Sequence, residues 1–194
     1  MADLPRQRAS GRLPGTWRAW SRNLMRTLCC LFALASGMVH APCRAAPDSA
    51  GFFDLTVGDL QGDLQQARAQ GKLGLLVMFE MDDCPYCRRM KETVFTQAEV
   101  KAYFRQRFVI LAVDVMGDVA LYDPTGRETR EKDFARAMRA TATPTFVFFD
   151  LEGRAVVRHV GATRDAREFM LLGRYVADGA YKTKSFTDYL RGAS

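Results

Sequence analysis

The chain has 194 residues and a formal net charge of +6, a balance often found in proteins that bind nucleic acid or anionic membranes. The excess lies entirely in residues 1–45, which hold seven arginines and one acidic residue, so residues 46–194 are formally neutral. We therefore expect no nucleic-acid partner for the folded part of the chain. No repeat or Pro/Ser-rich linker divides residues 46–194, and their length suits one hydrophobic core.

The first segment holds an uncharged stretch, Thr27–Val39, with arginines before it and small residues and prolines after it. A membrane-spanning helix needs about 20 apolar residues, whereas the apolar region of a secretory signal needs about 7 to 15. We therefore predict that residues 1–45 are a signal peptide cleaved after Ala45. The alternatives are an uncleaved membrane anchor and a lipoprotein, and no cysteine here follows the Leu-x-small-small pattern of lipoproteins. Translation starting at Met25 would give a more compact signal.

A helix and a buried strand follow. Leu60, Leu64 and Ala67 recur at helical spacing before Gly71, which predicts a helix, and residues 73–79 form a continuous apolar run of strand length. Such a run is typical of a strand that is buried on both faces.

A pair of cysteines comes next, in Cys84-Pro85-Tyr86-Cys87, and opens a predicted helix whose stem is 88–94. Proline suits the first helical turn because its missing N–H group costs little there. Free backbone N–H groups and the helix dipole stabilise a thiolate at such a position. We therefore predict Cys84 as a nucleophile and Cys87, one turn later, as the cysteine that resolves the resulting disulfide.

Cleavage of the signal would remove the other three cysteines and leave only this pair. A bridge between residues three apart constrains the unfolded chain little, so reactivity explains the pair better than stability does. A structural zinc site needs four ligands, and His159 is the one histidine of residues 46–194, so we expect no metal. The charges beside the pair either tune the thiol pKa or are ordinary solvated groups: Asp82, Asp83, Arg88 and Arg89.

The middle of the chain alternates again between helical and strand patterns. Residues 96–99, Thr-Gln-Ala-Glu, have the pattern of a capping box and predict a helix start. Residues 108–113 form a second buried strand, and Phe134, Ala137 and Met138 make an apolar stripe that predicts a helix over 128–139.

The last part begins with Thr143-Pro144-Thr145 directly before a third buried strand, 146–149. A cis Thr143-Pro144 bond would leave the Thr143 backbone free to pair with an extended substrate segment. Residues 155–160 look like a solvated antiparallel edge strand with His159 on it. A final helix follows, with Asp165 and Glu168 placed to cap it and Phe169, Leu172 and Val176 inward, and we expect the aromatic tail beyond it to pack on the core.

This order of elements predicts an α/β fold, and its motifs resemble the thioredoxin superfamily. The segments FEMDDCPYCRRM, TPTFVFFD and YVADGAYKTKSFTDYL are most similar to the SoxW-type periplasmic thioredoxins of bacterial sulfur-oxidation systems. The resemblance implies a thioredoxin-like domain over residues 46–194. Its central mixed sheet would have about four to five strands flanked by helices.

The resemblance also implies a function. In the periplasm, a membrane thiol-electron transporter of the CcdA/DsbD type would reduce the Cys84–Cys87 disulfide, and the dithiol would reduce disulfides of client proteins. Thr143 and Pro144 would bind the substrate backbone. No cofactor is needed because the dithiol is the redox centre, and we expect a monomer.

Two departures from the family pattern matter. Cytoplasmic thioredoxins have a buried Asp six residues before the nucleophile and a Trp directly before it, whereas this chain has Met78 and Asp83. Glu80 is therefore the candidate for proton transfer, with solvent as the alternative. Other functions remain open: a reductant for cytochrome c maturation, or a non-catalytic binding module. Pro85-Tyr86 is the glutaredoxin dipeptide, but export argues against that class.

Overall fold

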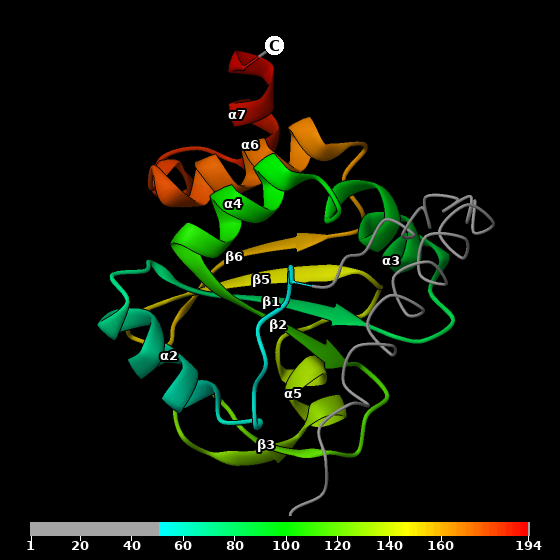
Figure 1. The fold of residues 1–194 in the computed structure, drawn as a ribbon, viewed down its shortest axis with the longest axis vertical. Helices are drawn as coiled ribbons and strands as arrows, with labels where there is room; N and C mark the ends of the chain where they lie inside the picture. Colours follow the sequence, from blue (N-terminus) through cyan, green and yellow to red (C-terminus); the bar gives the residue numbers. More distant parts are fainter. Residues whose placement is uncertain (1–50, 194) are drawn as a thin grey trace, which may run out of the picture. The chain divides into compact units, whose positions relative to one another are not determined.

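The computed structural model describes residues 51–193, so the predicted signal peptide, the Met25 start and the cleavage at Ala45 lie outside the described residues. No helix within 51–193 is long and apolar enough to cross a membrane. The elements, labelled as in Figure 1, are α2 (Leu60–Ala69), β1 (Gly74–Glu80), α3 (Pro85–Arg89), the π-helix η1 (Met90–Val94), α4 (Ala98–Arg107), β2 (Phe108–Asp114), β3 (Ala120–Tyr122), β4 (Glu128–Arg130), α5 (Glu131–Ala137), β5 (Thr145–Asp150), β6 (Ala155–Val160), α6 (Ala166–Ala177), the 3-10 helix η2 (Ala180–Lys182) and α7 (Phe186–Gly192).

Four strands form the central sheet in the order β2-β1-β5-β6 (Figure 1). β1 runs parallel to β2, and β5 is antiparallel to both of its neighbours. The chain crosses from β1 to β2 through α3, η1 and α4, the long connection that parallel neighbours require. The three buried strands and the edge strand are therefore confirmed, and so is the predicted fold class.

Helices cover both faces of this sheet (Figure 1). α2 and α5 pack on one face, and α3, η1, α4 and α6 pack on the other. Because side chains alternate along a strand, β1 sends Leu76 and Met78 to the second face and Leu75, Val77 and Phe79 to the first. A strand between two helical layers needs apolar residues at every position, which explains its unbroken apolar run.

The predicted helix over 128–139 is wrong at its start. Residues 128–130 form strand β4, which pairs with β3 in a separate two-stranded sheet. The turn between them is held by Asp123, whose carboxylate accepts from the N–H groups of Thr125 and Arg127 at 2.9 and 3.1 Å. Helix α5 then starts at residue 131, and its buried stripe contains Ala135, whereas the predicted Ala137 is exposed.

The segment after the cysteines also departs from a regular helix. α3 continues into the π-helix, where the N–H of Phe95 donates to the carbonyl of Met90 at 3.0 Å. The predicted capping box at residues 96–99 is wrong, because the Thr96 hydroxyl donates backward to the Glu92 carbonyl at 3.1 Å and Gln97 is the N-cap of α4. Thr96 thus finishes the preceding helix instead of starting the next one.

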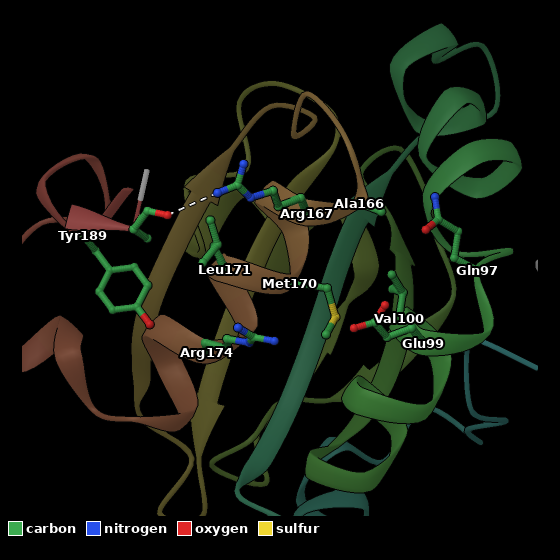
Figure 2. A pocket seen from close by; sticks show the side chains of 10 residues that line it. Gln97, Glu99, Val100, Ala166, Arg167, Met170, Leu171, Arg174 and Tyr189 are labelled. Carbon is green, nitrogen blue, oxygen red and sulfur yellow. Dashed lines mark hydrogen bonds between the residues drawn. The ribbon is translucent and has the colours of Figure 1, made fainter. Parts of the chain in front are cut away.

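The C-terminal helix α6 is capped as predicted, since the Asp165 carboxylate accepts from the Glu168 N–H at 2.8 Å. The tail beyond it folds back: the Tyr175 hydroxyl donates to the Lys184 carbonyl at 2.7 Å, and Tyr175 contacts Phe186 and other tail aromatics. The expected packing of the tail on the core is therefore confirmed. Between α4, α6 and α7 lies a cavity of about 490 Å³, with Arg167 bound to the carbonyl of residue 193 at its edge (Figure 2).

His159 is not a solvated residue, contrary to the prediction. It lies half-buried on β6, with its ring 6.4 Å from that of Phe146 and 5.5 Å from that of Phe186 in the tail. The prediction failed because Phe186 is 27 residues further along the chain and meets His159 only when the tail folds back on the core.

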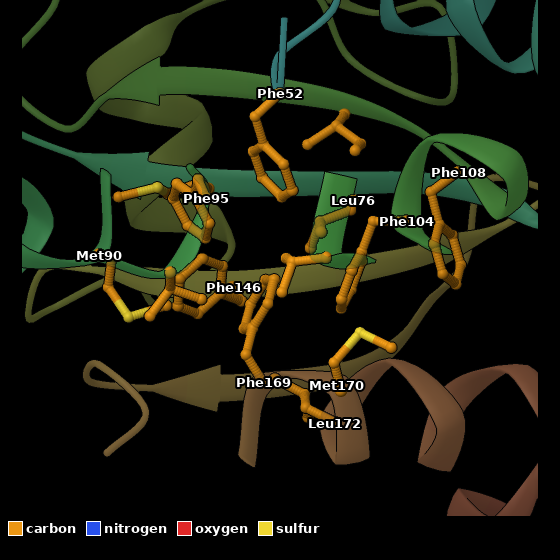
Figure 3. Close-up of a cluster of buried hydrophobic side chains, with 14 of the residues drawn as sticks. Phe52, Leu76, Met90, Phe95, Phe104, Phe108, Phe146, Phe169, Met170 and Leu172 are labelled. Carbon is orange, nitrogen blue, oxygen red and sulfur yellow. The ribbon is translucent and has the colours of Figure 1, made fainter. Parts of the chain in front are cut away.

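Phenylalanines dominate the core on the α4 and α6 face of the sheet (Figure 3). Phe52 stacks on Phe95 with ring centroids 4.1 Å apart, and Phe104 stacks on Phe169 at 4.3 Å. Both cysteines belong to this same buried cluster. The cysteine pair therefore packs against the phenylalanine-rich core on this face of the sheet.

Candidate active site

The two cysteines occupy the first turn of α3, as predicted. Cys84 is the N-cap residue, Pro85 takes the first helical position, and Cys87 faces the core. The structure joins Cys84 and Cys87 by a disulfide, with their Cα atoms 5.2 Å apart. Both cysteines are buried.

The helix start acts directly on the Cys84 sulfur. The backbone N–H of Cys87 points at this sulfur, with 3.0 Å between nitrogen and Sγ. In the reduced protein, a thiolate at Cys84 would accept this hydrogen bond and lie at the positive end of the helix. The position therefore favours Cys84 as the nucleophile, the role that the sequence predicts.

The Thr143-Pro144 segment lies at the same end of the sheet as the cysteines. β5 pairs with β1 so that Thr145 is opposite Phe79, just before the loop that leads to Cys84. The Thr143-Pro144 peptide bond is cis, and the Pro144 carbonyl accepts from the N–H of Gly161 at 2.8 Å. The sheet register thus brings together two segments about 60 residues apart in sequence, and substrate binding by Thr143 and Pro144 stays a prediction.

Glu80 lies on the cysteine side of the sheet. It ends β1, and by strand alternation it shares the face of Leu76 and Met78. Lys91, on the π-helix after the cysteines, binds its carboxylate at 2.6 and 2.7 Å. The sequence does not predict this partner, because nothing in the local pattern marks a lysine eleven residues away.

Met78 replaces a carboxylate with an apolar group. It is buried in the same cluster as Cys84 and Cys87, at the position where cytoplasmic thioredoxins have an aspartate. No ionisable side chain is therefore available at this position, and Glu80, two residues further along the same face, is the nearest acid along β1.

Arg89 has a structural role that the sequence did not reveal. Its guanidinium donates to the carbonyls of Thr163 and Arg164 at 2.6 and 3.0 Å, and so ties the cysteine helix to the loop after β6. The Thr163 hydroxyl is also 3.6 Å from the Met90 sulfur. By contrast, Arg88 is exposed, as are Asp82 and Asp83, which agrees with ordinary solvated charges.

Comparisons with known proteins agree with this geometry. Residues 60–177 match the family model of a thioredoxin-like domain. A putative disulphide-isomerase from Bacteroides thetaiotaomicron is 27% identical over 69% of this chain and 96% of its own, with a TM-score of 0.50. A thioredoxin-fold protein from Helicobacter pylori is 21% identical over 61% and 78%, also with a TM-score of 0.50.

A thioredoxin from Thermus thermophilus is 33% identical over 60% of this chain and 82% of its own, with a TM-score of 0.46. No protein with a curated description matches. The family model spans more than half of the chain and includes both cysteines and the Thr143-Pro144 segment. The chain therefore belongs to the thioredoxin-like domain family.

Proposed function

We propose that the protein is an exported thiol-disulfide oxidoreductase that reduces disulfides of periplasmic client proteins, in the manner of the SoxW-type thioredoxins. The observation that carries the proposal is the Cys84–Cys87 disulfide at a helix start, at the same end of the sheet as Thr143-Pro144. Export rests on the signal-like segment in residues 1–45, and the sulfur-oxidation assignment rests on the resemblance of the three sequence segments quoted above.

The reaction begins with the reduced dithiol. The Cys84 thiolate attacks one sulfur of the client disulfide, forms a mixed disulfide and releases the other client sulfur as a thiolate, which takes up a proton. Cys87 then loses its proton and attacks the Cys84 sulfur, which releases the second client thiol. The client disulfide is reduced by two electrons and the protein is left as the Cys84–Cys87 disulfide, the form that the structure contains.

Thr143 and Pro144 have different tasks in this scheme. The backbone of Thr143 pairs with an extended client segment, and buried Pro144 holds that backbone in place. A membrane thiol-electron transporter of the CcdA/DsbD type then returns two electrons to the disulfide. No cofactor enters either step.

Trapping a client tests this function. Cys87→Ser removes the resolving thiol, so mixed disulfides between Cys84 and clients should accumulate in cells and separate on a non-reducing gel. Mass spectrometry would identify them, and a trapped cytochrome c precursor would assign the protein to cytochrome c maturation instead of sulfur oxidation. The matched control is the double variant with Cys84→Ser, which should trap nothing.

Insulin reduction provides the test in vitro. The wild-type protein should reduce insulin at a rate that Cys84→Ser abolishes, because only Cys84 can start the exchange. Equal rates for the two proteins would contradict the proposal and leave a binding module on a thioredoxin-like scaffold.

A further inference from the structure

The cavity between α4, α6 and α7 has no part in the proposed redox reaction (Figure 2). Neither the cysteines nor the Thr143-Pro144 segment line it. Helix α7, which forms one wall, lies beyond residue 177, where the match to the thioredoxin-like domain ends. Its volume of about 490 Å³ is within the usual range for sites that bind small molecules.

One face of α6 forms the longest wall of this cavity. Arg167, Leu171 and Arg174 are spaced by four and three residues, so they share one face of the helix. Met170 also lines the cavity and is buried, as is Val100 on the facing side of α4. The cavity therefore combines apolar groups at its base with cationic groups at its rim.

The two arginines of this wall are in different situations. The Arg167 guanidinium donates to the carbonyl of residue 193 at 3.2 Å and so holds α7 against α6. The Arg174 guanidinium makes no hydrogen bond or ion pair with any other residue of 51–193. A guanidinium has five N–H donors in a planar fork that matches a carboxylate. Arg174 is therefore the group of this wall that is available to bind an anion.

The opposite wall carries one acid. Figure 2 shows Glu99, from the first turn of α4, and Arg174 on either side of Met170. The Glu99 carboxylate has no hydrogen bond or ion pair with the rest of the described chain, Arg174 included.

These charges select the kind of anion. Two arginines and one glutamate give the lining a formal charge of +1. A monoanion balances this charge, whereas a phosphate dianion would bring excess negative charge close to Glu99. The electrostatics of the cavity therefore favour a carboxylate over a phosphate.

We propose that this cavity binds a monocarboxylate with a short apolar body. Arg174 holds the carboxylate through paired N–H donors, and the apolar body is buried against Met170 and Val100. Two sources supply this chemistry: a free organic acid and the C-terminus of a polypeptide that ends in an apolar residue.

An NMR titration with three small compounds tests the ligand class. 4-Methylpentanoate should bind about tenfold more tightly than acetate, which lacks the apolar body, and than 4-methylpentanamide, which lacks the charge. The methyl signal of Met170 should shift, and that of Met116, which is exposed outside this cavity, should not. Equal binding of the acid and its amide would overturn the proposal.

Charge variants test the two walls in opposite directions. Arg174→Gln should raise the Kd for 4-methylpentanoate about tenfold, because it removes the charged donor. Glu99→Gln should lower this Kd about threefold, because it removes a nearby negative charge and keeps the side-chain size. Both positions are exposed, so neither change disturbs the core.

Arg191→Gln is the matched control. It removes the same charge from an exposed position on α7, but Arg191 binds Asp188 and does not line the cavity. It should leave the Kd nearly unchanged. An equal effect of Arg174→Gln and Arg191→Gln would show that only net charge matters and would overturn the proposal.

A peptide distinguishes the two sources. Acetyl-Gly-Gly-Leu with a free carboxylate represents a polypeptide C-terminus, and tighter binding than that of 4-methylpentanoate would assign the cavity to polypeptides. Tighter binding of 4-methylpentanoate would assign it to free acids. A Met170 signal that does not shift with either compound at millimolar concentration contradicts the site, whatever the outcome of the insulin assay.

Discussion

At the scale of single residues, the pair Glu80–Lys91 is the least ordinary feature of the site. Met78 takes the position of the buried acid of cytoplasmic thioredoxins, and Glu80, two residues further along the same face of β1, is bound by Lys91 of the π-helix η1. Glu80 is only slightly exposed, so its carboxylate keeps its position beside the π-helix. We propose that this carboxylate accepts the proton that Cys87 loses.

Glu80→Gln tests that role. The amide keeps the size of the side chain but cannot accept a proton, so release of the client from the mixed disulfide should slow by about a hundredfold. Lys91→Met should slow it much less, because the carboxylate remains. Stopped-flow measurement of the resolution step gives both rates, and a Glu80→Gln rate equal to that of the wild type would assign proton transfer to solvent.

At the scale of elements, the cysteine helix depends on a loop far from it in sequence. α3 has only five residues before it becomes a π-helix, so its own hydrogen bonds position the cysteines weakly. Arg89 supplies the missing support through the carbonyls of Thr163 and Arg164, which connects the helix to the end of β6.

Arg89→Met should therefore destabilise the protein by about 2 kcal/mol, since it removes two hydrogen bonds from a charged donor and leaves a partly buried carbonyl unpaired. Arg88→Met, at the exposed neighbouring position, should change the free energy of unfolding by less than about 0.5 kcal/mol. Urea unfolding followed by circular dichroism measures both values. Equal decreases in the free energy of unfolding would show that loss of a positive charge, and not loss of the two Arg89 hydrogen bonds, destabilises the protein.

At the scale of the whole molecule, the C-terminal tail packs on a residue of the edge strand β6. Here α7 supplies Phe186, which packs on His159 of β6, and the tail is tied to α6 by the Tyr175 hydroxyl. Burial lowers the pKa of His159, and Glu168 opposes this effect to a lesser extent.

This shift makes stability depend on pH. Because the pKa of His159 is lower in the folded protein, the unfolded chain takes up a proton first as pH falls through about 6.5, and the free energy of unfolding decreases. Above that pH, His159 is neutral in both the folded and the unfolded protein, so it adds no pH dependence to the free energy of unfolding. His159→Phe should remove this part of the decrease, which urea unfolding of both proteins at pH 7.5 and 5.0 would reveal, and parallel pH profiles would contradict it.

Much of the fold was predictable because a strand that is buried on both faces has apolar residues at nearly every position. The runs that became β1, β2 and β5 are apolar at nearly every position, and the helix between Asp165 and Val176 has both a cap and a stripe. The β3–β4 hairpin was missed because its strands have three residues each, too short for any periodicity. Its turn, closed by the Asp123 carboxylate, was the one available signal.

The motifs of the site can be recognised without a structure: two cysteines three apart at a helix start, and a Thr-Pro before a buried strand. Both depend on spacing along the chain, which local backbone geometry converts directly into structure. Three contacts arise only in the folded chain: Lys91 binds Glu80, Phe186 packs on His159, and Met81 and Met116 line one cavity with Thr143. These residues come from segments whose separation is set by sheet register and helix packing, and no local pattern records which distant side chain will meet which.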